Sequence, residues 1–111
     1  MNGIEAGVLL RFYTNEGRKH GHIALHEWLL EKARAMGIQG GSAFRAIAGY
    51  GRHGTLHEEH FFELAADLPI EVDFVVSDRQ ADALLEVLRG EQVRVFYARI
   101  PAQFGMIGGP P

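Results

Sequence analysis

The chain has 111 residues, 47% of them hydrophobic and 23% charged, which is the composition of one small globular domain. Its formal net charge is −3 and no basic cluster stands out, so we expect no nucleic-acid partner. Cysteine is absent, which excludes disulfide and thiol chemistry, and we find no signal peptide or membrane-length apolar run, so the sequence indicates a cytoplasmic protein.

The first half of the chain predicts a strand, a helix and a second strand. Residues 8–13 (VLLRFY) form an apolar run typical of a central strand, and the polar residues 15–21 predict a loop. In residues 24–36 apolar side chains recur at helical spacing, and Gly37 follows as the expected end of the helix. Residues 42–50 (SAFRAIAGY) lie between glycines and predict the second strand, although their alanines also permit a helix.

The second half repeats this order. Residues 70–76 (IEVDFVV) alternate between apolar and acidic side chains, which predicts a strand with one buried face. Ser77 and Gln80 match the capping box that opens many helices, and an apolar stripe at helical spacing follows. Residues 92–100 (QVRVFYARI) predict the last strand, which we expect to end at Pro101.

The order β-α-β-β-α-β predicts an α+β, ferredoxin-like fold, in which two helices cover one face of a four-stranded antiparallel sheet. We expect this fold to occupy residues 1–104 as a single domain. The tail of residues 105–111 (GMIGGPP) has no packing pattern and is predicted to be disordered.

Charged residues support a strand order of 4-1-3-2. In that order Glu71 and Asp73 on the third strand lie between Arg11 on the first strand and Arg45 on the second, with Arg94 on the edge strand. Opposite charges on neighbouring strands help to fix their register. The sheet face that carries them is expected to stay solvated or to pack against copies of itself.

A glycine-rich segment follows the second predicted strand. Gly49, Gly51 and Gly54 indicate a backbone that adopts positive φ or lets another group come close, and Arg52 adds a fixed positive charge. Exposed amide groups beside a cation suit an anion such as a phosphate. The alternative is a hairpin loop that binds nothing.

The sequence gives little support for catalysis or for a metal site. It has no nucleophile elbow or phosphate-binding loop, and the G-x-G-x-x-G pattern at Gly49 does not open a helix, so we expect no enzyme. Histidines form two groups without zinc-site spacing, and surface histidines are the favoured interpretation over a metal centre. The groups are His20, His22 and His26, then His53, His57 and His60.

Two segments resemble a known family. Residues 37–51 (GIQGGSAFRAIAGYG) are similar to the signature G-x-x-G-A-T-V-x-R-G-I-x-G-F-G of a PII-like family, number 190 among the domains of unknown function. Residues 67–72 (DLPIEV) resemble a second segment of that family. Residues 49–52 (GYGR) resemble the G-F-G-R at the base of the effector loop in PII signal transducers.

The resemblance implies a ferredoxin-like homotrimer that regulates a partner, such as a membrane transporter or an enzyme, and needs no cofactor. Sheet faces would line its centre, and an adenine nucleotide would bind between subunits. Gly49, Gly51, Arg52 and His53 would contact this nucleotide. The effector loop would comprise Gly54, Thr55, Leu56, His57 and Glu58.

The sequence departs from PII proteins between the second helix and the last strand. There PII proteins hold phosphates with a glycine- and lysine-rich loop, whereas this chain has only the short link of residues 89–91 (RGE). This departure disfavours ATP and leaves a smaller ligand, such as AMP, ADP or a cyclic nucleotide. Two alternatives remain open: a metal-binding trimer or metal-dependent enzyme that uses the histidines, and a structural module that binds a partner but no ligand.

Overall fold

A computed structural model describes residues 3–50, 56–58 and 68–109, with only the backbone described for residues 56–58. The first half of the chain contains β1 (Ile4–Asn15), β2 (Lys19–His20), β3 (Ile23–Ala24), α1 (Leu25–Ala35), β4 (Ser42–Arg45) and β5 (Ala48–Tyr50). The second half contains β6 (Leu56–Glu58), β7 (Pro69–Val76), α3 (Asp78–Gly90) and β8 (Phe96–Gly105).

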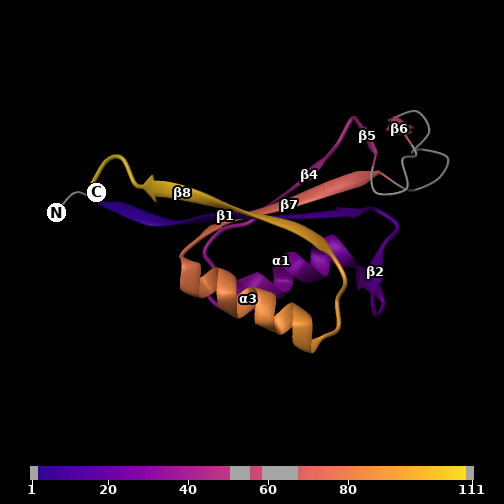
Figure 1. The fold of residues 1–111 in the computed structure, drawn as a ribbon, viewed down its shortest axis with the longest axis horizontal. Coiled ribbons are helices and arrows are strands. Elements are labelled where there is room, and N and C mark those ends of the chain that lie inside the picture. Colours follow the sequence, from indigo (N-terminus) through magenta and orange to yellow (C-terminus); the bar gives the residue numbers. More distant parts are fainter. Residues whose placement is uncertain (1–2, 51–55, 59–67, 110–111) are drawn as a thin grey trace.

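The main sheet has four antiparallel strands in the order β4-β7-β1-β8, and both helices lie on the same face of it (Figure 1). This arrangement confirms the predicted α+β, ferredoxin-like fold and the predicted strand order. Strand β8 ends at Gly105, and the division into a domain of residues 1–104 and a disordered tail stays a prediction.

The core lies between the sheet and the helices because alternate strand residues point to one face. Leu10 and Phe12 of β1 and Val72 of β7 have no exposed surface. Apolar stripes of α1 and α3 cover these side chains. Phe12 and Phe74 meet edge to face, with ring centroids 6.1 Å apart, a geometry that aromatic pairs favour.

The two helices begin differently. At the start of α3 the Ser77 side chain accepts a hydrogen bond from the backbone N–H of Gln80, and the Gln80 side chain accepts one from the Ser77 N–H, so the predicted capping box is confirmed. Helix α1 has Ala24 at the equivalent position, without a side-chain cap.

Both helices end with the same hydrogen-bond motif. Gly37, with φ 87°, closes α1, as the Gly37 N–H donates to Arg34 and the next N–H donates to Ala33. Gln92 occupies the corresponding position after α3 with φ 58°, which is uncommon for a residue with a side chain. Gln92, which was predicted to begin the last strand, therefore belongs to the end of α3.

The expected strand of residues 42–50 is wrong in one respect, because it is two strands. Ala46 makes the last contact with β7 by donating to the Pro69 carbonyl, 2.9 Å away. Pro69 begins β7 and has no amide hydrogen to continue the ladder. Beyond this point β5 leaves the main sheet and pairs with β6 in a separate hairpin.

Two other boundaries were also wrong. The last strand runs over Phe96–Gly105 instead of residues 92–100, and it continues through Pro101 because β8 is an edge strand, where proline is tolerated. The short strand β2 lies in the segment predicted as a loop and pairs with β3.

The predicted ion pairs of the sheet are partly confirmed. Arg11 contacts both Glu71 and Asp73, each through its Nε at 3.0 Å. Arg45 instead lies opposite Ile70 and pairs with Glu16, so its predicted pairing with the acidic residues of β7 is wrong. Neighbouring residues of a strand point to opposite faces of the sheet. Since Arg45 lies opposite Ile70, its side chain is on the other face from Glu71. Arg94 lies before β8, outside the sheet.

Candidate functional site

The base of the glycine-rich segment lies at one end of the main sheet. There β1 ends beside the start of β7, with Asn15 opposite Pro69 and the Glu16 N–H donating to the Leu68 carbonyl at 2.8 Å. The β5–β6 hairpin and strand β2 lie at this same end (Figure 1). Gly49 of β5 comes close to Pro69, since a Cβ built on it would lie 3.8 Å from the proline Cγ. We call this end of the sheet the loop-base end.

Gly49 is the one predicted nucleotide contact that the described residues include. It pairs with His57, and Tyr50 pairs with Leu56. Gly49 has no positive φ, and an added Cβ would make only an ordinary van der Waals contact. Within the described chain, neither its backbone conformation nor its space requires a glycine at this position.

The other predicted site residues fall partly outside the described chain. Gly51, Arg52, His53, Gly54 and Thr55 lie outside the described residues, so their proposed roles stay predictions. Three residues of the predicted effector loop, Leu56, His57 and Glu58, form strand β6.

A short basic turn, residues 18–20, lies at the loop-base end and contacts the link between α3 and β8. The Arg18 guanidinium donates a hydrogen bond to the Arg94 carbonyl. The His20 Nε2 lies 3.2 Å from a carboxylate oxygen of Glu91, and its ring lies 4.4 Å from that of Trp28. These contacts join the basic turn to Glu91 and Arg94, so the turn and the link between α3 and β8 hold each other in place.

Arg45 adds a second cation to the loop-base end. It stands at the end of β4, with its Nε 2.6 Å from a Glu16 carboxylate oxygen and 60% of its side chain exposed. The sequence correctly placed Arg45 on the second strand, but the predicted pairing with Glu71 and Asp73 missed its contact with Glu16. The signal that could have found this position is the nearness of Arg45 to Gly49, four residues further along the sequence.

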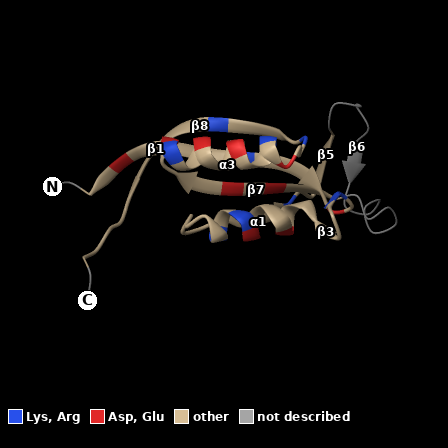
Figure 2. Ribbon diagram, turned by 90° about the horizontal axis from the view of Figure 1, so that it is seen from below, with Lys and Arg blue, Asp and Glu red and all other residues tan. Residues whose placement is uncertain are grey.

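The sheet face away from the helices, which we call the open face, carries a charged row in its middle. Ser42, Asp73, Arg11 and Ala98 lie side by side on adjacent strands. Figure 2 shows the acidic residues of β7 as a red band on its ribbon, and β7 lies between β4 and β1 in the sheet. Hydrogen bonding to Asp73, with a contribution from Tyr13, raises the pKa of Arg11 above its ordinary value. Burial raises the pKa of Glu71, and Asp73 acts in the same direction while Arg11 opposes it.

Apolar rows flank this charged row on the open face. One row contains Phe44, Tyr13 and Phe96, with Glu71 of β7 between Phe44 and Tyr13, and the rings of Tyr13 and Phe96 lie 5.5 Å apart. The other contains Val75 and Ile100 on either side of Leu9. Phe96 is 65% exposed and Val75 is 52% exposed. The solvated face of an antiparallel sheet usually carries polar side chains. The open face differs because it also exposes two rows with large apolar side chains.

No group of three or more histidine, aspartate or glutamate side chains is arranged to hold a metal ion in the part of the chain that the structure describes. His53 and His60 lie outside that part, and the structure gives no side chain for His57. The helices present there are too short or too polar to cross a membrane.

Two solved structures resemble the chain over almost its whole length. CPII from Thiomonas intermedia K12, a nitrogen regulatory PII-like protein bound to ADP, AMP and bicarbonate, aligns with a TM-score of 0.66 at 21% identity, over 93% of this chain and 92% of that chain. TTHA0516 from Thermus thermophilus, a proposed PII-like signaling protein, aligns with a TM-score of 0.62 at 17% identity, over the same shares, 93% and 92%. Identities this low carry the fold alone, and that fold is PII-like.

Sequence comparison gives the family. The model of family number 190 among the domains of unknown function, described as "Uncharacterized ACR, COG1993", matches residues 7–94. A UPF0166 protein of Aquifex aeolicus (strain VF5) is 32% identical over 83 residues, which are 75% of this chain and 79% of that protein. UPF0166 protein MJ1524 of Methanocaldococcus jannaschii is 26% identical over 80 residues, 72% of this chain and 73% of that protein. The chain belongs to this family, and the resemblance found in its sequence is confirmed.

Proposed function

We propose that the chain is a non-enzymatic, PII-like regulatory protein that assembles as a homotrimer, binds AMP or ADP between subunits, and signals through the loop after its second strand. It needs no resident cofactor in this role. The observation that carries the proposal is the departure of β5 from the main sheet. Gly49, a predicted nucleotide contact, and Tyr50 pair with β6 in a separate hairpin instead of with β7.

The open face supports assembly from copies of the same chain. Its exposed apolar rows gain free energy when they leave water, at roughly 25 cal/mol for each Å² of apolar surface buried. The charged row between them is already paired within one subunit, as Arg11 lies 3.0 Å from Asp73. The Arg11–Asp73 pair needs no partner from another subunit, and the raised pKa of Glu71, the second carboxylate on Arg11, favours its neutral form where this face is buried.

The loop-base end supports a nucleotide site. The similar protein CPII was solved with ADP and AMP, and its fold matches this chain. We assign the nucleotide contacts to Gly49, Gly51, Arg52 and His53. Since nothing in the described chain requires glycine at position 49, close approach of a ligand gives a reason for it. Arg45 lies at the same end as a further cation for a phosphate.

Signalling would then be a shift between loop conformations. A nucleotide at the loop base favours one conformation of the effector loop, Gly54 to Glu58, and a transporter or enzyme binds that conformation. The hairpin geometry supports this, because a change at Gly49 is transmitted to its partner His57 across the β5–β6 pair.

The test is thermal unfolding of the full chain with AMP, ADP, ATP and cyclic AMP. A nucleotide at about 100 times its Kd stabilises the folded form by roughly 2.7 kcal/mol, so the melting temperature rises. We expect AMP or ADP to give this rise, Arg52→Ala to abolish it, and Arg79→Ala, which removes an exposed arginine of α3, to retain it. If the melting temperature of Arg52→Ala rises as much as that of the unaltered chain, Arg52 does not contact the nucleotide. If no nucleotide raises the melting temperature, the structural module that binds no ligand is favoured.

A further inference from the structure

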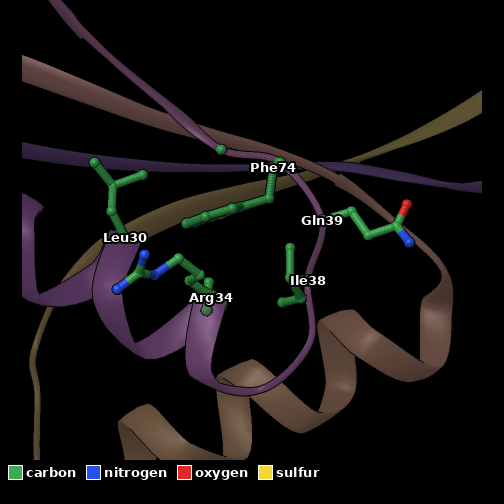
Figure 3. A pocket seen from close by; sticks show the side chains of 8 residues that line it. Leu30, Arg34, Ile38, Gln39 and Phe74 are labelled. Carbon is green, nitrogen blue, oxygen red and sulfur yellow. The ribbon is translucent and has the colours of Figure 1, made fainter.

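A pocket of about 310 Å³ opens on the side of the molecule that carries the helices. It lies between the second half of α1, the segment that leads into β4, and β7 (Figure 3). Its lining residues are Leu30, Ala33, Arg34, Ile38, Gln39, Gly40, Gly41 and Phe74. Gly41 precedes β4 and Gly49 follows it, so this pocket and the loop-base end lie at opposite ends of that strand.

The floor of the pocket is apolar. Phe74 is 2% exposed and Ile38 is 6% exposed, and in Figure 3 both point toward the same space as Leu30. Gly41 shapes this floor, because a Cβ at that position would lie 2.5 Å from a ring carbon of Phe74. Any larger residue at position 41 would push the Phe74 ring out of its place. The glycine therefore lets the backbone cross the ring and leaves the pocket open beside it.

One cation stands at the rim. Arg34 is exposed in the last turn of α1, and its guanidinium lies beside Leu30 on the pocket side (Figure 3). Arg34 makes no ion pair with any of the residues described. Arg89, in the last turn of α3, is bound to Glu86 at 3.2 Å. Gln39 points away from the pocket.

We propose that this pocket binds a small aromatic carboxylate, with its ring against Phe74 and Leu30 and its carboxylate on the Arg34 guanidinium. A volume of about 310 Å³ lies at the lower end of the range for small-molecule pockets, which suits a single ring. An arginine beside a carboxylate forms charge-assisted, paired hydrogen bonds. At Gly40 and Gly41 the wall consists of main chain alone, which lets a planar ligand approach. This site goes beyond the nucleotide function proposed above.

The test is a titration of the full chain with phenylacetate. The amide signals of Gly40, Gly41 and Phe74 in proton–nitrogen NMR spectra report binding. We expect saturable shifts at these residues. Arg34→Gln should weaken binding about tenfold, since a hydrogen bond to a charged group contributes at about that level. Arg89→Gln is the matched control and should bind phenylacetate as the unaltered chain does. Phenylacetamide, which keeps the ring but not the charge, should bind as weakly as phenylacetate binds to Arg34→Gln.

A second variant tests the cavity itself. Leu30→Trp fills the pocket from its half-buried side, and it should abolish the phenylacetate shifts while the unfolding transition stays cooperative. Equal binding by Arg34→Gln and the unaltered chain, or no saturable shift at all, would overturn the proposal. Displacement of phenylacetate by AMP would also overturn it, by making the pocket part of the nucleotide site. Because the nucleotide proposal is tested through Arg52, either proposal can fail without the other.

Discussion

The two faces of the main sheet are built from the same strands and meet different surroundings. On the helix side Leu10, Phe12 and Val72 have no exposed surface. On the open face, Val75 of β7 is 52% exposed and Phe96 of β8 is 65% exposed. The subunit covers only one of its two apolar surfaces. This difference teaches that one chain completes its helix side by itself and leaves the open face uncovered, as the proposed assembly requires.

The largest effect is expected on the helix side. Phe12→Ala removes a fully buried ring that meets Phe74 edge to face, and should lower the free energy of unfolding by about 3–5 kcal/mol. Urea unfolding measures this loss. The matched change on the open face, Phe96→Ala, should alter the unfolding of the dissociated chain by less than about 1 kcal/mol, because its ring is already mostly exposed. Equal losses in the two variants would contradict the distinction between the faces.

The next effect concerns assembly. Val75→Asp places a charge in an apolar row of the open face, and burying it unpaired between subunits should cost about 3 kcal/mol per subunit. Sedimentation velocity should then show a trimer for the unaltered chain and a monomer for the variant. Ile107→Asp is the control, since Ile107 is fully exposed beyond β8 and should leave the trimer intact. A trimer that tolerates Val75→Asp would place the subunit contact elsewhere.

Much of the covered face could be predicted from local patterns in the sequence. Alternation in residues 70–76 marks its buried positions, and the pair Ser77 and Gln80 marks the start of α3 by contacts only three residues apart. The positive φ of Gln92 carries no such mark, and neither does the start of β8 at Phe96.

The features that carry function depend on contacts between distant segments. The break between β4 and β5 follows from Pro69 at the start of β7, which no reading of residues 42–50 alone can anticipate. The pocket requires Gly41 to cross the ring of Phe74, and the position of Arg45 at the loop-base end requires the register of β4 on β7. Such sites are fixed by strand register, which local sequence patterns leave undefined.

A smaller effect is expected within the charged row. Asp73→Asn keeps the shape of the side chain but removes the carboxylate that holds Arg11 through two hydrogen bonds, at 3.0 and 3.3 Å. The loss should be about 1–2 kcal/mol, because both side chains are only partly buried. Urea unfolding of the dissociated chain measures it. The control is Asp82→Asn, which weakens a more exposed pair with Arg99 and should cost less than about 1 kcal/mol.

The smallest effect should come from Glu71 and should depend on pH. Burial raises the pKa of this carboxyl, so the folded chain binds its proton more tightly than the unfolded chain does. The stability contributed by the protonated form is fully present below the unfolded pKa and is lost as the pH rises through the folded pKa. Glu71→Gln, which stays neutral, should therefore be as stable as the unaltered chain at neutral pH, or more stable by less than about 1 kcal/mol. The advantage should shrink as the pH falls, in unfolding curves measured from neutral pH to pH values below the unfolded pKa. An advantage that grows as the pH falls would mean that the attraction of Arg11 outweighs burial, and that the Arg11–Glu71 ion pair stabilises the open face of the single chain.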